Sequence, residues 1–167
     1  MNYFELFGLP IGFKVDPVQL RKSFMEIQRS SHPDKFAQAS PEEQEAALEK
    51  SSMANKGFTL LNNKALVIPY VLELNGYMES DEKYALDPDF LMEMMELNEA
   101  WMDADDEDMK KLVKQRVDTI QSAILTPVKA VLDTTSVHTI SREEMSQVKE
   151  YYYKQKYLNR ILADFHE

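Results

Sequence analysis

The stretch RSSHPDKF, residues 29–36, interrupts a strongly helical sequence with a histidine–proline–aspartate tripeptide. Pro33 has no backbone N–H to donate and restricts the residue before it, so a helix that approaches from the N-terminal side has to end near His32. The tripeptide alone fits a helix-ending turn, part of a catalytic dyad or a surface that another protein binds. The sequence on either side of it separates these three interpretations.

Helices are predicted on both sides of the tripeptide. Asp16 can cap a helix N-terminus, and Pro17 suits the first helical position. A second helix begins where Ser40 and Glu43 have the spacing of a capping box. Residues 16–61 therefore predict an antiparallel helical hairpin with the tripeptide in its loop.

The first helix of this hairpin is amphipathic. Leu20, Phe24 and Ile27 form one apolar stripe, as expected for a helix that packs on a neighbour. The basic residues of the opposite face are Arg21, Lys22 and Arg29. The segment from residue 14 to residue 35 carries five lysines and arginines against three acids, whereas residues 81–108 carry twelve acids and one lysine. Such a split fits two partners of opposite charge, or simply solvated helix surfaces.

The rest of the chain also predicts helices. We expect residues 69–75 to form a short helix that ends at Gly76, a common helix-terminating residue. Three longer helices begin after Asp87, Asp106 and Ser141, and the second of them bends or breaks at Pro127. The predicted fold class is all-α, and its three parts are an N-terminal helical-hairpin domain (1–76), a linker (77–86) and a C-terminal antiparallel three-helix bundle (87–167).

Composition excludes several classes of protein. The net charge of −10 over 167 residues argues against general nucleic-acid binding, and no apolar run is long enough to span a membrane. With no cysteine, the chain has neither disulfides nor thiolate metal sites. The opening MNYFELFGLP lacks the basic start and apolar stretch of a signal peptide, so we expect a cytoplasmic protein.

A catalytic interpretation of the tripeptide finds little support. His138 and His166 lie in separate late segments, and no histidine spacing typical of a metal site occurs. The acidic stretch at residues 103–111 does not match a calcium loop, because Asp108 stands where the turn glycine belongs. We therefore expect no metal, no cofactor and no catalytic residue. A small helical hydrolase that uses His32 and Asp34 stays as the less favoured alternative.

The combination of a basic-faced helix, the tripeptide and a capped second helix resembles the J-domain of DnaJ-type proteins. The resemblance covers about residues 1–76. It implies that this part binds a DnaK-type chaperone and stimulates its ATPase. The residues that match the chaperone-binding positions are His32, Pro33 and Asp34, with electrostatic support from Lys35, Arg21, Lys22 and Arg29.

The second half of the chain narrows the resemblance. Together with YFELFGL and HPDKF, the segment FLMEMMELNEAW at residues 90–101 resembles HscB, the J-protein of iron–sulfur cluster assembly. In that family, the C-terminal domain holds the scaffold protein IscU, and the pair is delivered to the DnaK-type chaperone HscA. By this resemblance, the scaffold-binding residues are Leu91, Met92, Met95, Glu96, Glu99 and Tyr157.

The helix that begins at Asp87 is apolar on more than one side, which gives independent support. Phe90, Met94, Leu97 and Trp101 share one stripe, and Leu91, Met92 and Met95 lie off it. Two interpretations remain open for the second group: burial between other helices, or a methionine-rich surface that contacts a partner.

We therefore predict a non-enzymatic co-chaperone that binds an IscU-like scaffold and an HscA-like chaperone. A J-domain adaptor for a different client protein is the main alternative. One departure from the family pattern is Gly57, which replaces the usual alanine in a helix and is expected to cost about 1 kcal/mol.

Overall fold

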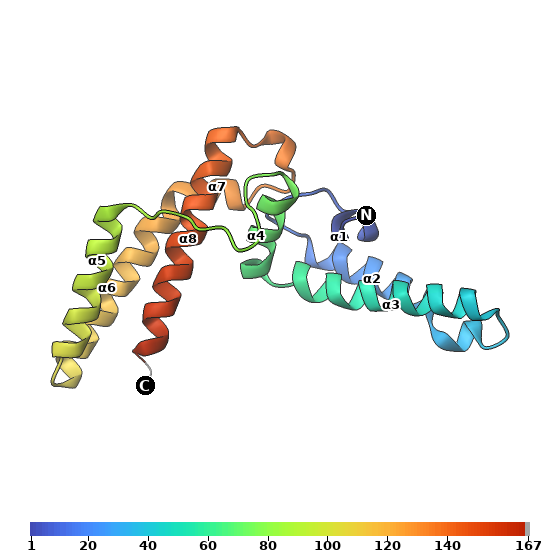
Figure 1. Ribbon diagram of the computed structural model, residues 1–167, viewed down its shortest axis with the longest axis horizontal. Coiled ribbons are helices and arrows are strands. Elements are labelled where there is room, and N and C mark those ends of the chain that lie inside the picture. Colours follow the sequence, from blue (N-terminus) through green and yellow to red (C-terminus); the bar gives the residue numbers. More distant parts are fainter. Residues whose placement is uncertain (166–167) are drawn as a thin grey trace. The chain divides into compact units, whose positions relative to one another are not determined.

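The computed structural model describes residues 1–165 (Figure 1), and within them all regular structure is helical, which confirms the predicted all-α class. By packing, the chain groups into two compact units. The first contains residues 1–71 and 133–140, and the second contains residues 72–132 and 141–167. The helices in chain order are α1 (Tyr3–Phe7), α2 (Pro17–Ser31), η1 (Pro33–Phe36), α3 (Pro41–Leu61), α4 (Lys64–Leu74), α5 (Pro88–Asp103), α6 (Glu107–Leu125), η2 (Thr126–Val128), α7 (Lys129–Leu132), η3 (Val137–Thr139) and α8 (Arg142–Asp164).

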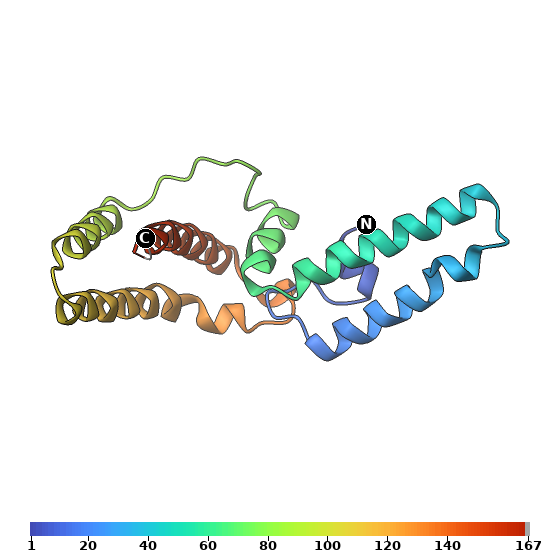
Figure 2. The ribbon, with the colours of Figure 1, turned by 90° about the horizontal axis from the view of Figure 1, so that it is seen from below.

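Helices α2 and α3 form the predicted antiparallel hairpin, and Figure 2 shows them side by side with the connecting turn at one end. Leu20 and Ala54 are fully buried between the helices, and the rings of Phe24 and Phe58 stack with their centroids 4.3 Å apart. Gln28 adds a polar connection, because its side chain donates to the Asn55 side chain at 3.0 Å. The apolar stripe of α2 thus packs on α3, and α2 also contacts α1.

Two aromatic rings of α1, those of Tyr3 and Phe7, pack against α3 at Gly57. Phe4 and Phe7 are buried, and Tyr3 stacks on Tyr70 at 5.5 Å. A Cβ atom at Gly57 would lie 2.7 Å from Cδ1 of Tyr3 and 3.0 Å from Cε2 of Phe7. The glycine therefore does more than weaken the helix, because it allows these rings to approach the α3 backbone.

The prediction for the short fourth helix was wrong at its start. Helix α4 begins at Lys64 rather than at Pro69. The side chain of Asn63 accepts a hydrogen bond from the backbone N–H of Ala65 at 3.0 Å and so caps the helix. The sequence pattern did not predict this cap. Pro69 lies inside the helix, where burial of the Val67 side chain helps to offset the hydrogen bond that a proline cannot donate.

A segment from late in the chain completes the first unit. Residues 133–140 lie against residues 11–14, where the carbonyl of Thr134 accepts from the Lys14 N–H at 3.2 Å and the Val137 N–H donates to the Ile11 carbonyl at 2.8 Å. Gly12 lies between these bonds, and a Cβ atom there would overlap the Thr135 carbonyl. Only glycine permits this close approach of two backbone segments.

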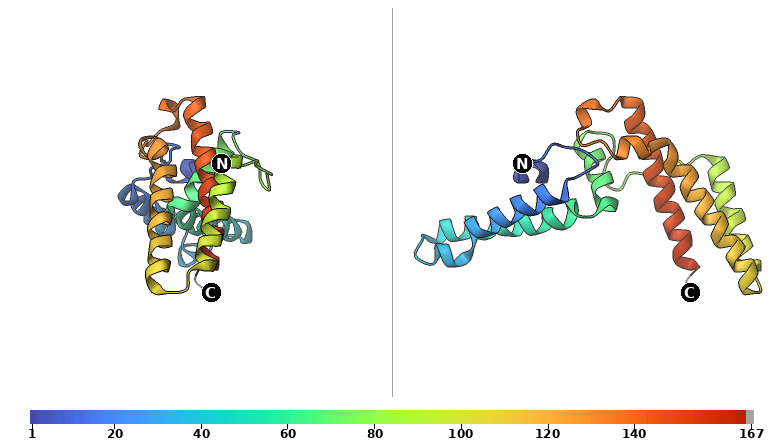
Figure 3. Two further views of the ribbon diagram at one scale, coloured as in Figure 1. Left: turned by 90° about the vertical axis from the view of Figure 1, so that its left-hand side faces the viewer. Right: turned by 180° about the vertical axis from the view of Figure 1, so that it is seen from behind.

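The second unit is built around α5, α6 and α8, which run alternately down, up and down in Figure 1 and in the right-hand view of Figure 3. Their core contains Phe90, Met94 and Leu97 of α5, which confirms the predicted core stripe. At one end of the bundle, Trp101 stacks on Phe165 with ring centroids 4.5 Å apart. The predicted break at Pro127 is confirmed, because α6 ends at Leu125 and gives way to η2.

One acidic residue, Glu82, connects the segment before α5 to α8 through two hydrogen bonds. Glu82 accepts from Lys149 Nζ at 2.8 Å and from the Tyr153 hydroxyl at 3.0 Å. The ring of Tyr153 stacks on Tyr84 at 4.5 Å. The hydrogen bond from Lys149 holds the pKa of Glu82 below its ordinary value of 4.5, and burial together with the bond to Glu82 raises the pKa of Tyr153.

Gly57→Ala is expected to lower the free energy of unfolding, because about 1–3 kcal/mol of overpacking against Tyr3 exceeds the gain of about 1 kcal/mol in helix propensity. Removing the ring with Tyr3→Ala should reduce the penalty of the glycine substitution. Urea unfolding of the wild type, both single variants and the double variant measures this coupling. Equal penalties in both backgrounds would contradict the steric explanation.

Glu82→Gln is expected to lower the melting temperature at pH 7. A carboxyl whose pKa is lower in the folded chain contributes stability above its unfolded pKa, and this contribution is lost as the pH falls through the folded value. The difference between wild type and variant should therefore shrink as the pH falls below about 4.5. Calorimetry at several pH values measures it, with Glu99→Gln, an exposed acid of α5, as the control.

Candidate functional site

The histidine–proline–aspartate tripeptide forms the tip of the α2–α3 hairpin. Helix α2 ends at Ser31, whose hydroxyl donates to the Ile27 carbonyl at 2.6 Å inside the hairpin. His32 leaves the helical conformation, with φ −62° and ψ 135°, and Pro33 starts the short helix η1. The chain turns at this point because Pro33 cannot extend α2.

The side chain of His32 caps the turn that it precedes. Its Nδ1 accepts the backbone N–H of Asp34 at 3.2 Å. In a neutral imidazole this bond assigns the ring proton to Nε2, which remains free to donate outward. The Asp34 side chain is 92% exposed, and its carboxylate lies 3.6 Å from the same Nδ1. The turn therefore presents an acceptor and a donor to solvent.

A glutamine on α3 holds the turn in place. The Gln44 side chain donates to the carbonyls of Phe36 at 2.9 Å and Ala39 at 3.3 Å. These bonds connect α3 to the last residue of η1 and to the residue that precedes the α3 N-cap. Gln44 is a positioning residue that the sequence reading missed, because nothing in the local pattern distinguishes it from a solvated glutamine.

The predicted basic residues Arg21, Lys22, Arg29 and Lys35 are all exposed. Among the residues that the structure describes, the ion pairs involve none of these four cations. Met25 lies between Lys22 and Arg29 on the outer side of α2 and is 42% exposed. The surface thus combines free positive charge with an apolar side chain that the sequence reading did not include.

Part of the predicted scaffold-binding set is exposed on the surface of α5. Met92 and Met95 are 59% and 62% exposed, so burial between other helices does not account for them. Glu99 is also exposed. Met102, which the sequence reading left out, is 75% exposed and lies seven residues beyond Met95, two turns along the same side of the helix.

Three members of the set have contacts within the second unit. Leu91 and Tyr157 are half-buried, and the Tyr157 ring meets Phe90 edge to face at 6.4 Å. Glu96 accepts from Arg116 of α6 at 3.2 Å, which places it on the side of α5 that faces α6. A partner on this surface would therefore find Met92 and Met95 free and Glu96 already paired.

Residues 1–165 contain no group of side chains arranged for catalysis or for metal binding. No set of three or more histidine, aspartate or glutamate side chains in that range could hold a metal ion. His32 and Asp34 contact each other, and no serine, threonine or lysine is hydrogen-bonded to either side chain in the described range. No helix described for these residues is long and apolar enough to cross a membrane.

Comparisons with known proteins place this architecture in one family. Residues 86–166 match the model of the HSCB C-terminal oligomerisation domain. A co-chaperone protein HscB homolog of Vibrio atlanticus (strain LGP32) is 36% identical over 74% of this chain and 80% of its own length. A homolog from Vibrio cholerae serotype O1 (strain M66-2) is 41% identical over 59% of this chain and 58% of its own length.

Solved structures agree with this assignment. The crystal structure of the human co-chaperone protein HscB covers 99% of this chain with a TM-score of 0.74 and 27% identity, and 81% of that chain is matched. The chaperone HscB from Vibrio cholerae covers 98% with a TM-score of 0.64 and 29% identity, and 96% of it is matched. The relatives are named co-chaperones, not enzymes, so the hydrolase alternative falls away. The chain belongs to the HscB family of co-chaperones.

Proposed function

We propose that this chain acts in cytoplasmic iron–sulfur cluster assembly, where it binds an IscU-like scaffold and delivers it to an HscA-like chaperone. Residues 1–76 serve as the J-domain that stimulates the chaperone's ATPase, residues 77–86 as the linker and residues 87–167 as the scaffold-binding domain. Membership of the HscB family supports the general role, and the two exposed surfaces support the division of labour.

The exposed carboxylate of Asp34 carries the chaperone half of the proposal. At 92% exposure it is free to accept a charge-assisted hydrogen bond from an arginine or lysine of the chaperone. The free cations Arg21, Lys22, Arg29 and Lys35 would steer an acidic surface towards the turn and raise the association rate more than the affinity. Such a contact is brief and weakens with salt.

The methionine-rich side of α5 carries the scaffold half. Burying exposed Met92 and Met95, together with half-buried Leu91 and Tyr157, would contribute up to about 1.5–3 kcal/mol for each fully buried side chain. The entropy lost on association offsets part of this gain, which leaves a specific and reversible complex. Glu96 and Glu99 would form the polar rim of the contact.

Asp34→Asn is expected to remove most of the stimulation of an HscA-type ATPase and to leave scaffold binding unchanged. The substitution keeps the size of the side chain and removes the charge, so the half-maximal concentration should rise at least about tenfold. Steady-state ATP hydrolysis measures the effect. Glu45→Gln, an exposed acid of α3 outside the turn, is the matched control and should behave as wild type.

Leu91→Ala with Met95→Ala should produce the reverse pattern, with scaffold binding weakened at least about tenfold and ATPase stimulation by the free co-chaperone retained. Calorimetric titration with an IscU-type scaffold measures the affinity. Met109→Ala with Leu112→Ala is the matched control, because these two side chains are 42% and 65% exposed on α6. If either test variant lost both activities while folded, the two-surface model would be wrong.

The same titration separates the proposal from its main alternative. A J-domain adaptor for another client would stimulate the chaperone normally and form no complex with an IscU-type scaffold. Absence of binding by the wild-type chain, together with normal ATPase stimulation, would therefore favour the alternative client.

A further inference from the structure

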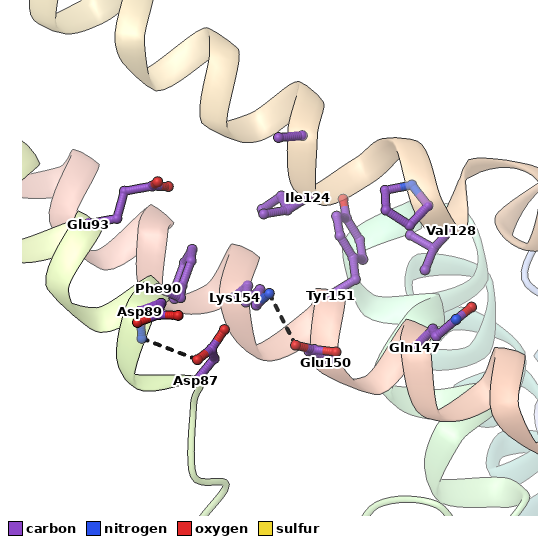
Figure 4. Close-up of a pocket in the computed structure, with 12 residues that line it drawn as sticks. Asp87, Asp89, Phe90, Glu93, Ile124, Val128, Gln147, Glu150, Tyr151 and Lys154 are labelled. Carbon is purple, nitrogen blue, oxygen red and sulfur yellow. Dashed lines mark hydrogen bonds and ion pairs between the residues drawn. The ribbon is translucent and has the colours of Figure 1, made fainter.

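A cavity lined by described residues lies in the second unit, on a different side of α5 from the methionines. It has a volume of about 410 Å³ and is enclosed by the start of α5, the end of α6 with η2, and the middle of α8 (Figure 4). Pockets that bind ligands usually measure about 300–1,000 Å³, so this one is of ordinary size. The proposed chaperone and scaffold surfaces use none of its lining residues.

The lining of this pocket combines an apolar floor with an acidic rim. Buried Phe90 and Val128 and half-buried Ile124 and Tyr151 supply the floor. Four carboxylates and one ammonium group surround it, and they belong to Asp87, Asp89, Glu93, Glu150 and Lys154. The rim therefore keeps an excess of negative charge.

Helix capping explains only part of this acidity. The Asp87 side chain accepts the Asp89 N–H at 3.1 Å, and acids are favoured in the first turn of a helix. Glu93 lies beyond that turn, and Glu150 belongs to a different helix. The ion pairs of residues 1–165 include no partner for Asp87, Asp89 or Glu93, so three of the four carboxylates are available to a cation from outside.

The pocket already holds one cation of this chain, which indicates the chemistry that it accepts. Lys154 Nζ lies 3.1 Å from a Glu150 carboxylate oxygen and 5.4 Å from the centroid of the Phe90 ring, while its side chain is only 20% exposed. A lysine in this position combines an ion pair, a cation–π contact and burial of its methylene stem. A second basic side chain would find the same combination of carboxylate and apolar surface.

We propose that this pocket binds a basic segment of a partner protein, with lysine or arginine side chains at short intervals. Asp87 and Glu93 are six residues apart, roughly 9 Å along the helix axis. One metal ion could not contact carboxylates spread over this distance, whereas basic residues two apart in an extended chain, about 7 Å from one another, could. The free carboxylates supply complementary charge, and the floor accommodates the stems.

The test is a titration of the ¹⁵N-labelled full-length chain with a blocked eight-residue peptide of alternating lysine and alanine, at low salt. We expect saturable amide shifts centred on Phe90, Ile124 and Tyr151. Asp89→Asn with Glu93→Gln should weaken binding at least about threefold. Asp103→Asn with Asp105→Asn removes the same charge outside the pocket and should change the affinity less than twofold.

A second variant tests the cavity itself. Ala123 is exposed on the pocket wall, and Ala123→Lys would place a cation of the chain inside it. This substitution should block the peptide, whereas Gln115→Lys, at an exposed position of α6 outside the pocket, should weaken it only slightly through net charge. Circular dichroism checks that both variants fold.

Three results would overturn the proposal. Equal losses in the pocket and control variants would show that general acidity attracts the peptide. Spermidine that bound as tightly as the peptide, at the same amides, would identify a small polyamine ligand. Shifts confined to Met92 and Met95 would move the basic segment to the proposed scaffold surface.

Discussion

A single missing hydrogen-bond donor determines how this protein presents its N-terminal surface. Because Pro33 has no N–H, α2 ends at Ser31 and the chain reverses through η1 before α3 begins. The reversal places Asp34 in the short helix η1 with its side chain 92% exposed, and the hydrogen bond from its own N–H to His32 fixes the local conformation. Packing of Phe24 on Phe58 keeps the two helices together so that the turn stays at their end.

The two units are compact, but neither is a continuous piece of the chain. Residues 133–140 belong by packing to the first unit, where backbone hydrogen bonds join them to residues 11–14. A fragment that stopped at residue 76 would lack this segment and would leave the Ile11 carbonyl and the Lys14 N–H without their partners. Proline-directed turns and capped helices therefore define the elements locally, whereas the first unit depends on contacts between residues more than one hundred positions apart, and the second on contacts such as Glu82 with Lys149, 67 positions apart. Functional tests of either surface for this reason require the full chain.

Local signals predicted most of the helices because each has a local cause. Asp16, Ser40, Asp87, Asp106 and Ser141 accept backbone N–H groups at the starts of five helices, and these caps can be read from the sequence. The start of α4 was missed because Pro69 is a stronger visible signal than Asn63, although burial of Val67 and Val71 supports a helix around it. Gln44 donates to carbonyls five and eight residues before it, a spacing that no helix or cap pattern marks, and the close approach at Gly12 involves Thr135, far away in sequence, so neither was predicted. The apolar excess of α5 was visible, but only the structure separates exposed Met92 and Met95 from half-buried Leu91.

Different sides of α5 carry the core stripe, the proposed scaffold surface and part of the proposed pocket. Phe90, Met94 and Leu97 occupy the side that faces the core, while Met92 and Met95 point to solvent. Glu93 and Glu96 lie towards α6, where the first lines the acidic pocket and the second pairs with Arg116. Because residues one and two apart on a helix do not face each other, these surfaces can be occupied independently, and an apolar partner on one side leaves the carboxylates on the other accessible. The buried stripe limits how much of α5 a partner can contact. Only about half of each helical turn is free for binding, because the other side chains pack α5 into the bundle.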